Sequence, residues 1–471
     1  MSCFIITPYY KIQMTFNKYG VLQIRKALHF DISRDSPVKI IACLCIPLSA
    51  VYLLSCLTTS FTNVLYSKYV KEYFEVAGLI STAVTSFSMI TCGVASAAWI
   101  KTAFFYKSDN CHRKNFLANA LYSILFTDIM LIAIFLIFKN AVFRLFNIPN
   151  ELYESVNNYY IVSIFAYVFT SVATYLINCI NGIGSVFEIL VANTINSCGT
   201  AVSAIILFSV FNAGIAGAAL VTPVCSVFVV LYGAILLKRK KIPIKFNRDN
   251  WRPDQSMIFN ILKLGILMGS QCLFCQVGDI CLSLQTNKYL SLNYISVLTV
   301  IIPLTSVFSS FSSAINAFVP INYQLGKTVR VKKFINTLII AALIYSALCT
   351  TIYATLGKWY YSTLFDDPKV IALGAEYWRI YSIGTVPLCL IYVFKYFFDC
   401  IGYNKLAFLS GPMQMAGALF GSYVLIPIFG NSGRSWGIVF EYLTAATYLI
   451  ISYSVLYRKI YYKKGDCYEN N

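Results

Sequence analysis

Long apolar segments separated by short polar or basic stretches divide the chain from residue 40 to residue 457. A segment of about 20 mostly apolar residues is long enough to cross a bilayer as a helix. An open sheet could not satisfy its backbone hydrogen bonds there. The pattern therefore predicts an all-α membrane protein with twelve transmembrane helices. Their expected positions are 40–63, 74–99, 116–138, 158–180, 186–210, 213–237, 258–285, 292–319, 333–356, 377–400, 405–428 and 435–457.

The composition supports this interpretation, because 58% of the residues are hydrophobic and only 12% are charged. Soluble domains carry about 25% charged residues. Most of the 16 cysteines lie inside the apolar segments, where Cys behaves as a small hydrophobic residue. Cys272 and Cys275 form a CxxC with no second CxxC and no nearby His, so we expect no metal site. The N-terminus lacks the pattern of a signal peptide.

The basic residues, which give a net charge of +18, gather in alternate loops between the predicted helices. Loops rich in Lys and Arg face the cytoplasm. This distribution predicts that both termini lie on the cytoplasmic side and disfavours nucleic-acid binding. The basic set comprises Lys18, Arg25, Lys26, Lys101, Lys107, Arg113, Lys114, Lys238, Arg239, Lys240, Lys241, Lys245, Arg248, Lys327, Arg330, Lys332, Lys333, Arg458, Lys459, Lys463 and Lys464.

Short matches at nearly one offset relate the first six predicted helices to the last six. The matched pairs are LFNIP (145–149) with LFDDP (364–368), GIG ending at Gly184 with CIG ending at Gly402, and FNAGIAG (211–217) with FGNSGRSWG (429–437). With six helices in each half, the repeats must share one orientation. The chain is therefore predicted to form two parallel six-helix bundles that rock around a central site.

This organisation defines five predicted regions. They are a cytoplasmic N-terminal segment (1–38), an N-lobe (39–237), a basic cytoplasmic linker (238–257), a C-lobe (258–457) and a cytoplasmic tail (458–471).

Five motifs resemble the multidrug and toxic compound extrusion (MATE) family, which shares a superfamily with polysaccharide flippases. They are NAGIAGAALVT (212–222), ILKLGILMGSQ (261–271), NYQLGKTVRVKK (322–333), EYWRIYSIGTVPL (376–388) and LIPIFG (425–430). The resemblance covers roughly residues 40–457. It implies a multi-pass protein of the cytoplasmic (inner) membrane that exports bulky, often cationic organic compounds, driven by inward movement of Na⁺ or H⁺. It implies no enzymatic activity and no cofactor besides the coupling ion.

The sequence departs from the family where N-lobe carboxylates usually lie. The Asp late in the first span is replaced by Asn63, and a second acidic position in the fifth span holds Ala204. An acidic residue that some members carry early in the seventh span falls near Cys275 or Gln276. The usual N-lobe cation site is therefore not expected here, although Asn63 remains a candidate by position.

Two acidic residues in the middle of predicted spans are candidates for binding the coupling cation or the substrate. Asp128 lies in the third span and Asp279 in the seventh. Ionisable groups within a membrane are costly and are often functional. Cys272, Gln276, Asp279 and Ser283 follow helical spacing and would share one face. The alternative for Asp128 is a hydrogen-bonded structural carboxyl, and for the Asp279 face a polar tether between helices.

Two further acids complete the set of candidates. Asp399 follows Lys395 by four residues, so this pair can neutralise itself on one helix face. Glu441 could face the interior of the C-lobe, or could pair with Arg434. The aromatic residues could form belts at the interface, and some of the tyrosines could contact planar cations.

Three functions remain open on the sequence. The favoured one is the secondary active exporter, acting as a monomer on a small organic substrate in the lipid bilayer. A lipid-linked oligosaccharide or polysaccharide flippase would need bases inside the spans, where Lys395 is deepest and Lys263 and Arg379 lie near span ends. A membrane enzyme is disfavoured because the longest internal loop holds only Asp249 and Asp254 as acids.

Overall fold

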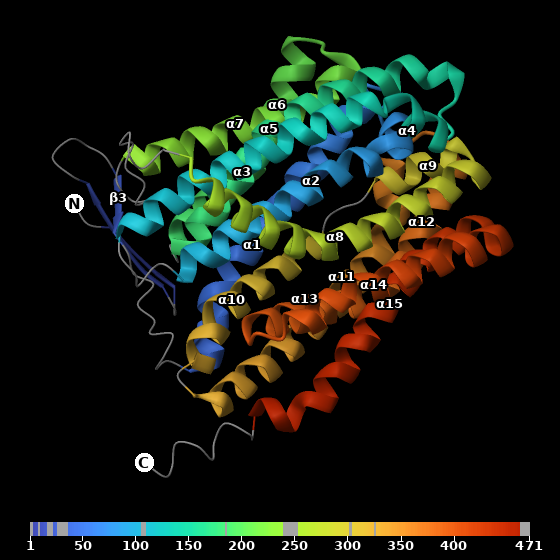
Figure 1. Cartoon of the computed structure of the whole chain (residues 1–471). Helices are drawn as coiled ribbons and strands as arrows, with labels where there is room; N and C mark the ends of the chain where they lie inside the picture. The colour runs from blue at the N-terminus through green and yellow to red at the C-terminus, as the bar shows by residue number, and fades with distance from the viewer. Residues whose placement is uncertain are drawn as a thin grey trace, which may run out of the picture.

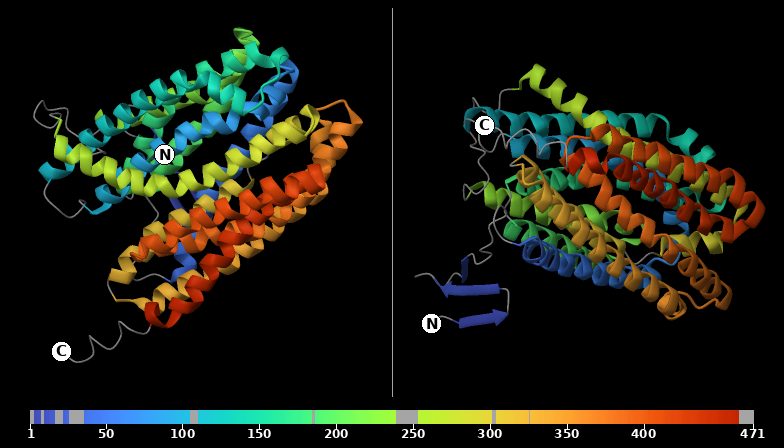
Figure 2. Two further views of the ribbon diagram at one scale, coloured as in Figure 1. Left: turned by 45° about the vertical axis from the view of Figure 1, so that its right-hand side comes forward. Right: turned by 90° about the horizontal axis from the view of Figure 1, so that it is seen from below.

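The computed structural model describes nine stretches of the chain: residues 3–7, 10–16, 22–25, 36–104, 110–183, 186–238, 253–300, 304–324 and 326–461. From residue 36 onward the described chain is helical, with short turns between the helices. The N-terminal half (blue to green) and the C-terminal half (yellow to red) form two groups of long helices side by side (Figures 1 and 2).

Within the described residues, the N-terminal half contains seven α-helices and two short helical segments. The helices are α1 (Pro37–Tyr69), α2 (Tyr73–Phe104), α3 (Asn110–Ile137), α4 (Lys139–Leu145), α5 (Tyr153–Ile183), α6 (Val186–Ile205) and α7 (Gly214–Lys238). The short segments are a 3₁₀ turn, η2 (Asn150–Leu152), and a π-helical turn, η3 (Ile206–Val210).

The C-terminal half is built in the same way. Its helices are α8 (Gln255–Tyr289), α9 (Leu292–Thr299), α10 (Phe308–Gln324), α11 (Thr328–Ser362), α12 (Pro368–Ile383), α13 (Thr385–Cys400), α14 (Asn404–Phe420) and α15 (Ile426–Tyr461). A 3₁₀ turn, η5 (Leu304–Val307), and a π-helical turn, η6 (Gly421–Leu425), complete it.

The described residues of the predicted spans are mostly helical, although the eighth span covers α9, η5 and α10 and the eleventh covers α14, η6 and the start of α15. The apolar character of these helices makes the chain a multi-pass membrane protein. Within the described residues, eight helical segments are long and apolar enough to cross a membrane, or nine if the bent α12–α13 pair is one span. Their outer faces carry large apolar side chains such as Leu57, which is 69% exposed. The number twelve and the cytoplasmic position of both termini remain predictions.

The tenth predicted span, 377–400, differs from the structure at its start and in its middle. Its helix begins at Pro368, because the Asp367 side chain accepts a hydrogen bond from the Lys369 backbone N–H and Pro368 occupies the first helical position. The chain then bends by 40° between α12 and α13. The predicted loop 429–434 is also helical except at Gly430, whose φ of 56° requires a left-handed conformation.

Three short strands precede α1 and add to the predicted all-helical fold. They are β1 (Cys3–Thr7), β2 (Tyr10–Phe16) and β3 (Leu22–Arg25), which pair in the antiparallel order β1-β2-β3. Residues 239–252 of the predicted linker 238–257 lie outside the described residues, as do Lys463 and Lys464 of the predicted tail.

The two halves repeat each other's local structure at the sequence offset noted above. The π-helical turn η3 is followed by Asn212 at φ 47°, and η6 is followed by Gly430 at φ 56°. Their packing also corresponds, since α1 lies against α6 and α10 while α8 lies against α14 and α2. Both α1 and α8 therefore contact a helix of each half. The domain boundaries themselves stay a prediction.

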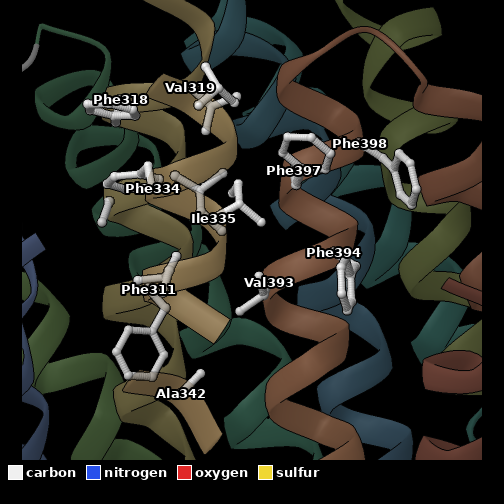
Figure 3. Packing of buried hydrophobic residues seen from close by; sticks show 14 of the residues in the cluster. Phe311, Phe318, Val319, Phe334, Ile335, Ala342, Val393, Phe394, Phe397 and Phe398 are labelled. Atoms are coloured by element: carbon white, nitrogen blue, oxygen red, sulfur yellow. The ribbon is translucent and has the colours of Figure 1, made fainter. Parts of the chain in front are cut away.

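A large apolar core fills the C-terminal half and includes the first turns of α1. Figure 3 shows Phe318 and Phe334 next to each other, with Phe397 on the neighbouring helix α13. The rings of Phe318 and Phe334 are stacked with centroids 4.0 Å apart. Ile40 and Leu44 of α1 belong to the same cluster. The start of α1 is thereby packed against the opposite half of the molecule.

Candidate coupling and substrate site

Glycines allow α8, α14 and α15 to approach closely in the middle of the C-terminal half. A Cβ built on Gly421 would lie 2.5 Å from the Cα of Gly437, and one built on Gly278 would lie 2.7 Å from the Ala418 Cβ. Small residues at helix contacts are a common basis of packing in membranes. The Leu282 side chain of α8 reaches to within 2.9 Å of the position that a Gly437 Cβ would take.

This contact brings three charged side chains together. Asp279 lies one turn before Leu282 on α8, while Arg434 and Glu441 lie on either side of Gly437 and share one face of α15. Arg434 interacts electrostatically with both carboxylates, and the two carboxylates interact with each other. We refer to Asp279, Glu441 and Arg434 as the acid–arginine cluster.

The cluster lies inside the protein. Glu441 is 4% exposed and Arg434 is 9% exposed, while Asp279 is partly exposed. The Nε and Nη1 atoms of Arg434 have no hydrogen-bond partner among the described residues. A buried donor without a partner costs free energy, and more so when it is charged. Arg434 therefore retains capacity to bind a ligand.

Tyrosines from three helices surround the cluster. Tyr294 of α9 and Tyr377 of α12 are buried with ring centroids 6.4 Å apart in an edge-on arrangement, and both interact electrostatically with Arg434. The Tyr294 hydroxyl donates to the Asn431 carbonyl at 2.7 Å, which fixes its ring against α15. Tyr442 of α15 interacts electrostatically with both Glu441 and Asp279. Three tyrosines thus lie near the cluster.

The predicted polar face of the seventh span is divided between two neighbours. Gln276 donates through Nε2 to the Thr82 carbonyl of α2 at 3.2 Å, and the Ser283 and Thr82 hydroxyls share a hydrogen bond of 2.8 Å. Gln276 and Ser283 therefore tether α8 to α2 across the two halves. Asp279, between them in sequence, contributes to the acid–arginine cluster.

Asp399 and Lys395 form a second charged group in α13. They interact electrostatically, as the sequence spacing predicts. Lys395 also interacts with Cys272 and Cys275 of α8. The two cysteines are free, and Cys275 Sγ contacts the Gln414 side-chain oxygen of α14. Asp399 is thus balanced by a nearby base on its own helix.

Asp128 is fully buried in the N-terminal half, with 0% of its surface exposed. The Ser171 hydroxyl of α5 donates to Asp128 Oδ2, whereas Oδ1 has no hydrogen-bond partner within the described part of the chain. The nearest polar environment of Asp128 is therefore one hydroxyl on a neighbouring helix. It can serve as a structural carboxyl or bind a small cation through Oδ1.

Asn63 connects the two halves instead of lining an N-lobe cation site with a second acid. Its Nδ2 donates to the Tyr360 hydroxyl of α11 at 3.4 Å. One turn further along α1, the Ser67 hydroxyl donates to the Leu364 carbonyl at 2.7 Å. Ala204, the second departure from the family pattern, is buried among apolar residues.

Both acids of the cluster stand out in the sequence, whereas Arg434 appears there only as a possible partner of Glu441, and Tyr294 and Tyr377 are not singled out. Two GxxxG motifs, at 417–421 and 433–437, were the sequence signal that could have indicated this helix contact. Such spacing puts both glycines on one helix face and predicts close packing. It would have placed Arg434, next to Gly433, at a helix contact.

Together these features define a multi-pass membrane protein with two helical halves and a buried charged site in one of them. Residues 293–411 match the MatE family model. The chain also superposes on an inward-facing multidrug resistance MATE family transporter of the MOP superfamily with a TM-score of 0.76, covering 92% of this chain and 100% of that one at 15% identity. The predicted resemblance to the MATE family is confirmed.

Two more proteins are similar to this chain. "Multidrug export protein MepA" of Staphylococcus haemolyticus (strain JCSC1435) is 23% identical over 249 residues, which are 51% of this chain and 54% of that protein. The match thus spans about half the length of this curated relative. A MOP superfamily transporter from Pyrococcus furiosus, described as having a binding pocket of reverse polarity, gives a TM-score of 0.74 at 16% identity over 93% of this chain and 99% of that one.

Proposed function

We propose that the chain is a secondary active exporter that moves organic, often cationic compounds out of the cell by alternating access. The export is coupled to inward movement of Na⁺ or H⁺. The observation that carries the proposal is the acid–arginine cluster, because it places two carboxylates on different helices inside a membrane protein, where ionisable groups are costly and are often functional. The MATE fold supports it, since two halves that contact through α1 and α8 suit rocking motions.

In this proposal Asp279 and Glu441 bind the coupling cation, and the tyrosines around them contact the organic substrate. Two carboxylates and one guanidinium leave one negative charge, which favours a cation as ligand. Tyr294 and Tyr377, buried next to the cluster, are the aromatic residues proposed to contact a planar cation when the helices move apart. Asp128 is a second candidate for the coupling cation, while Asp399 has its charge balanced by Lys395.

The oligomeric state, the membrane, the orientation and the cofactor need of the protein are also proposed. The chain acts as a monomer in the cytoplasmic membrane with both termini inside, and it needs no cofactor besides the coupling ion. It catalyses no covalent reaction, and among the described residues no group of three or more His, Cys, Asp or Glu side chains could hold a metal ion.

A flippase for lipid-linked saccharides is the second candidate, and the unpartnered Nε and Nη1 of Arg434 favour it, because a diphosphate could accept their hydrogen bonds. The acids beside both interior bases oppose it. Arg434 lies near Asp279 and Glu441, and Lys395 lies near Asp399, so a diphosphate would meet more acids than bases.

Efflux from proteoliposomes tests the exporter directly. Purified protein is reconstituted into liposomes that are loaded with a fluorescent organic cation. A Na⁺ or H⁺ gradient is then imposed across their membrane. Wild-type protein should export the dye under one gradient, and Asp279→Asn and Glu441→Gln should abolish this dependence. Asp366→Asn, which removes an exposed acid, is the matched control. The exporter is rejected if neither gradient drives efflux, and flipping of a fluorescent lipid diphosphate saccharide would then establish the flippase.

A further inference from the structure

Arg434 interacts with two carboxylates at once. Within the described chain it is the cation that interacts with both Asp279 and Glu441. It is more than nine-tenths buried, and Leu282 at Gly437 holds its helix against α8. Its charge therefore acts on the same two carboxylates that would bind a coupling cation.

The guanidinium stands beside these carboxylates without being locked to another group. Its Nε and Nη1 have no hydrogen-bond partner among the described residues. An arginine docked on a carboxylate normally forms short, charge-assisted hydrogen bonds through such atoms. The other groups that interact with the cluster are the neutral phenols of Tyr294, Tyr377 and Tyr442 and the thiol of Cys275. The charge balance of the cluster is thus set by its three members.

We propose that Arg434 is a tethered competitor of the coupling cation at the Asp279 and Glu441 carboxylates. The inference rests on the proposed function and adds how the site is regulated. A bound cation repels the guanidinium from the carboxylates, and the guanidinium in turn weakens the binding of the cation. Such coupling is reciprocal by thermodynamic necessity. Since one negative charge remains after Arg434 is counted, the site takes one monovalent cation in each cycle.

The competition is measured as binding of radioactive sodium to the purified protein in detergent. Arg434→Gln should tighten Na⁺ binding by about tenfold or more, because a unit positive charge a few ångströms away is removed. The number of Na⁺ ions bound per protein should rise from 1 towards 2, since the second carboxylate becomes free. Arg434→Lys, which keeps the charge, should bind Na⁺ nearly as the wild type does. Arg379→Gln removes the same charge from an exposed position of α12 and is the matched control.

A proton can take the place of sodium, and infrared spectroscopy of the carboxyl groups distinguishes the two ions. If the proton is the ligand, sodium binding is weak in all variants and Arg434→Gln increases the protonated carboxyl band at pH 7. The increase should be absent in Arg434→Gln combined with Asp279→Asn and Glu441→Gln.

The inference fails if Arg434→Gln leaves both sodium binding and the carboxyl band unchanged, or weakens cation binding. Its failure is separable from that of the proposed function, because binding is measured without transport. Tighter cation binding in Arg434→Gln, together with wild-type proteoliposomes that move no dye under either gradient, would retain the competition and reject the exporter. Gradient-driven efflux by the wild type, together with no effect of Arg434→Gln on cation binding or on the carboxyl band, would retain the exporter and reject the competition.

Discussion

In the N-terminal half, the buried carboxyl of Asp128 meets one hydroxyl, that of Ser171, whereas in the C-terminal half Asp279 and Glu441 share Arg434. The backbones of the two halves correspond closely, down to a π-helical turn followed by a left-handed residue. A repeated fold therefore does not imply a repeated site. The chemistry depends on which side chains a few helix contacts bring together.

The largest expected effect is on transport, and it distinguishes the acid of the C-terminal half from the acid of the N-terminal half. Asp279→Asn should lower gradient-driven efflux by about 100-fold, equivalent to about 2.7 kcal/mol, because the variant cannot bind the coupling cation at the acid–arginine cluster. Asp128→Asn should lower it by less than about threefold, since Asp128 interacts with a single hydroxyl. Equal losses in the two variants, measured as initial efflux rates, would place a coupling site in each half.

The next largest effect concerns the glycine contact that assembles the cluster. Gly421→Ala places a Cβ 2.5 Å from the Gly437 Cα, and because that atom is backbone the helices must separate. We expect a loss of about 3 kcal/mol in stability, at the upper end for overpacked cores. The thermal unfolding midpoint in detergent measures it. Gly357→Ala, whose Cβ would meet Trp378 at an ordinary 3.5 Å, is the control and should unfold near the wild-type temperature.

A smaller effect is expected from the hydrogen bond in the N-terminal half. Ser171→Ala removes the donor to Asp128 Oδ2 and leaves a buried carboxyl without that partner. This should cost about 1–2 kcal/mol of stability. A double-mutant cycle with Asp128→Ala measures the interaction itself. If the two losses simply add, Ser171 and Asp128 do not stabilise each other, and the structural role of Asp128 is contradicted.

The smallest effect is expected at the contact between the halves. Ser283→Ala breaks the hydrogen bond to Thr82 and should cost about 0.6 kcal/mol, the average for such pairs between membrane helices. Thr82→Ala should give a similar loss, and the double variant little more. A loss above about 2 kcal/mol in unfolding experiments would show that this tether is a principal contact between the halves.

Much of the fold was predictable because hydrophobic length is a strong signal in membrane proteins. The fifth predicted span, 186–210, coincides with α6 and η3, and the repeat motifs mark corresponding turns. The tenth span was predicted to start at Tyr377, where the aromatic residues Tyr377 and Trp378 begin an apolar run. Its helix starts at Pro368, with Asp367 as the N-cap. The strands β1 to β3 were missed although Tyr10–Phe16 and Leu22–Arg25 alternate between apolar and polar residues, which is itself the signal of a strand.

Individual residues of the candidate site were predictable from the sequence, but their arrangement in space was not. Asp279 and Glu441 stood out because acids are rare in apolar spans, and their positions needed no structural information. The separation of Gln276 from Asp279 could not be inferred, since a helix face is wide enough to contact two neighbours. Arg434 could be proposed as a partner of Glu441, but its relation to Asp279 required the contact between α8 and α15.

The sequence by itself determined that this is a helical membrane protein with an internal repeat and a MATE-like pattern, because spans, turns and acids are local properties of the chain. The tertiary structure decided which of these acids meet. Glycines 278, 421 and 437 lie far apart in sequence or on separate helices, and only their close packing joins Asp279 to Arg434 and Glu441. Electrostatic interaction depends on distance in space, which the order of residues does not contain.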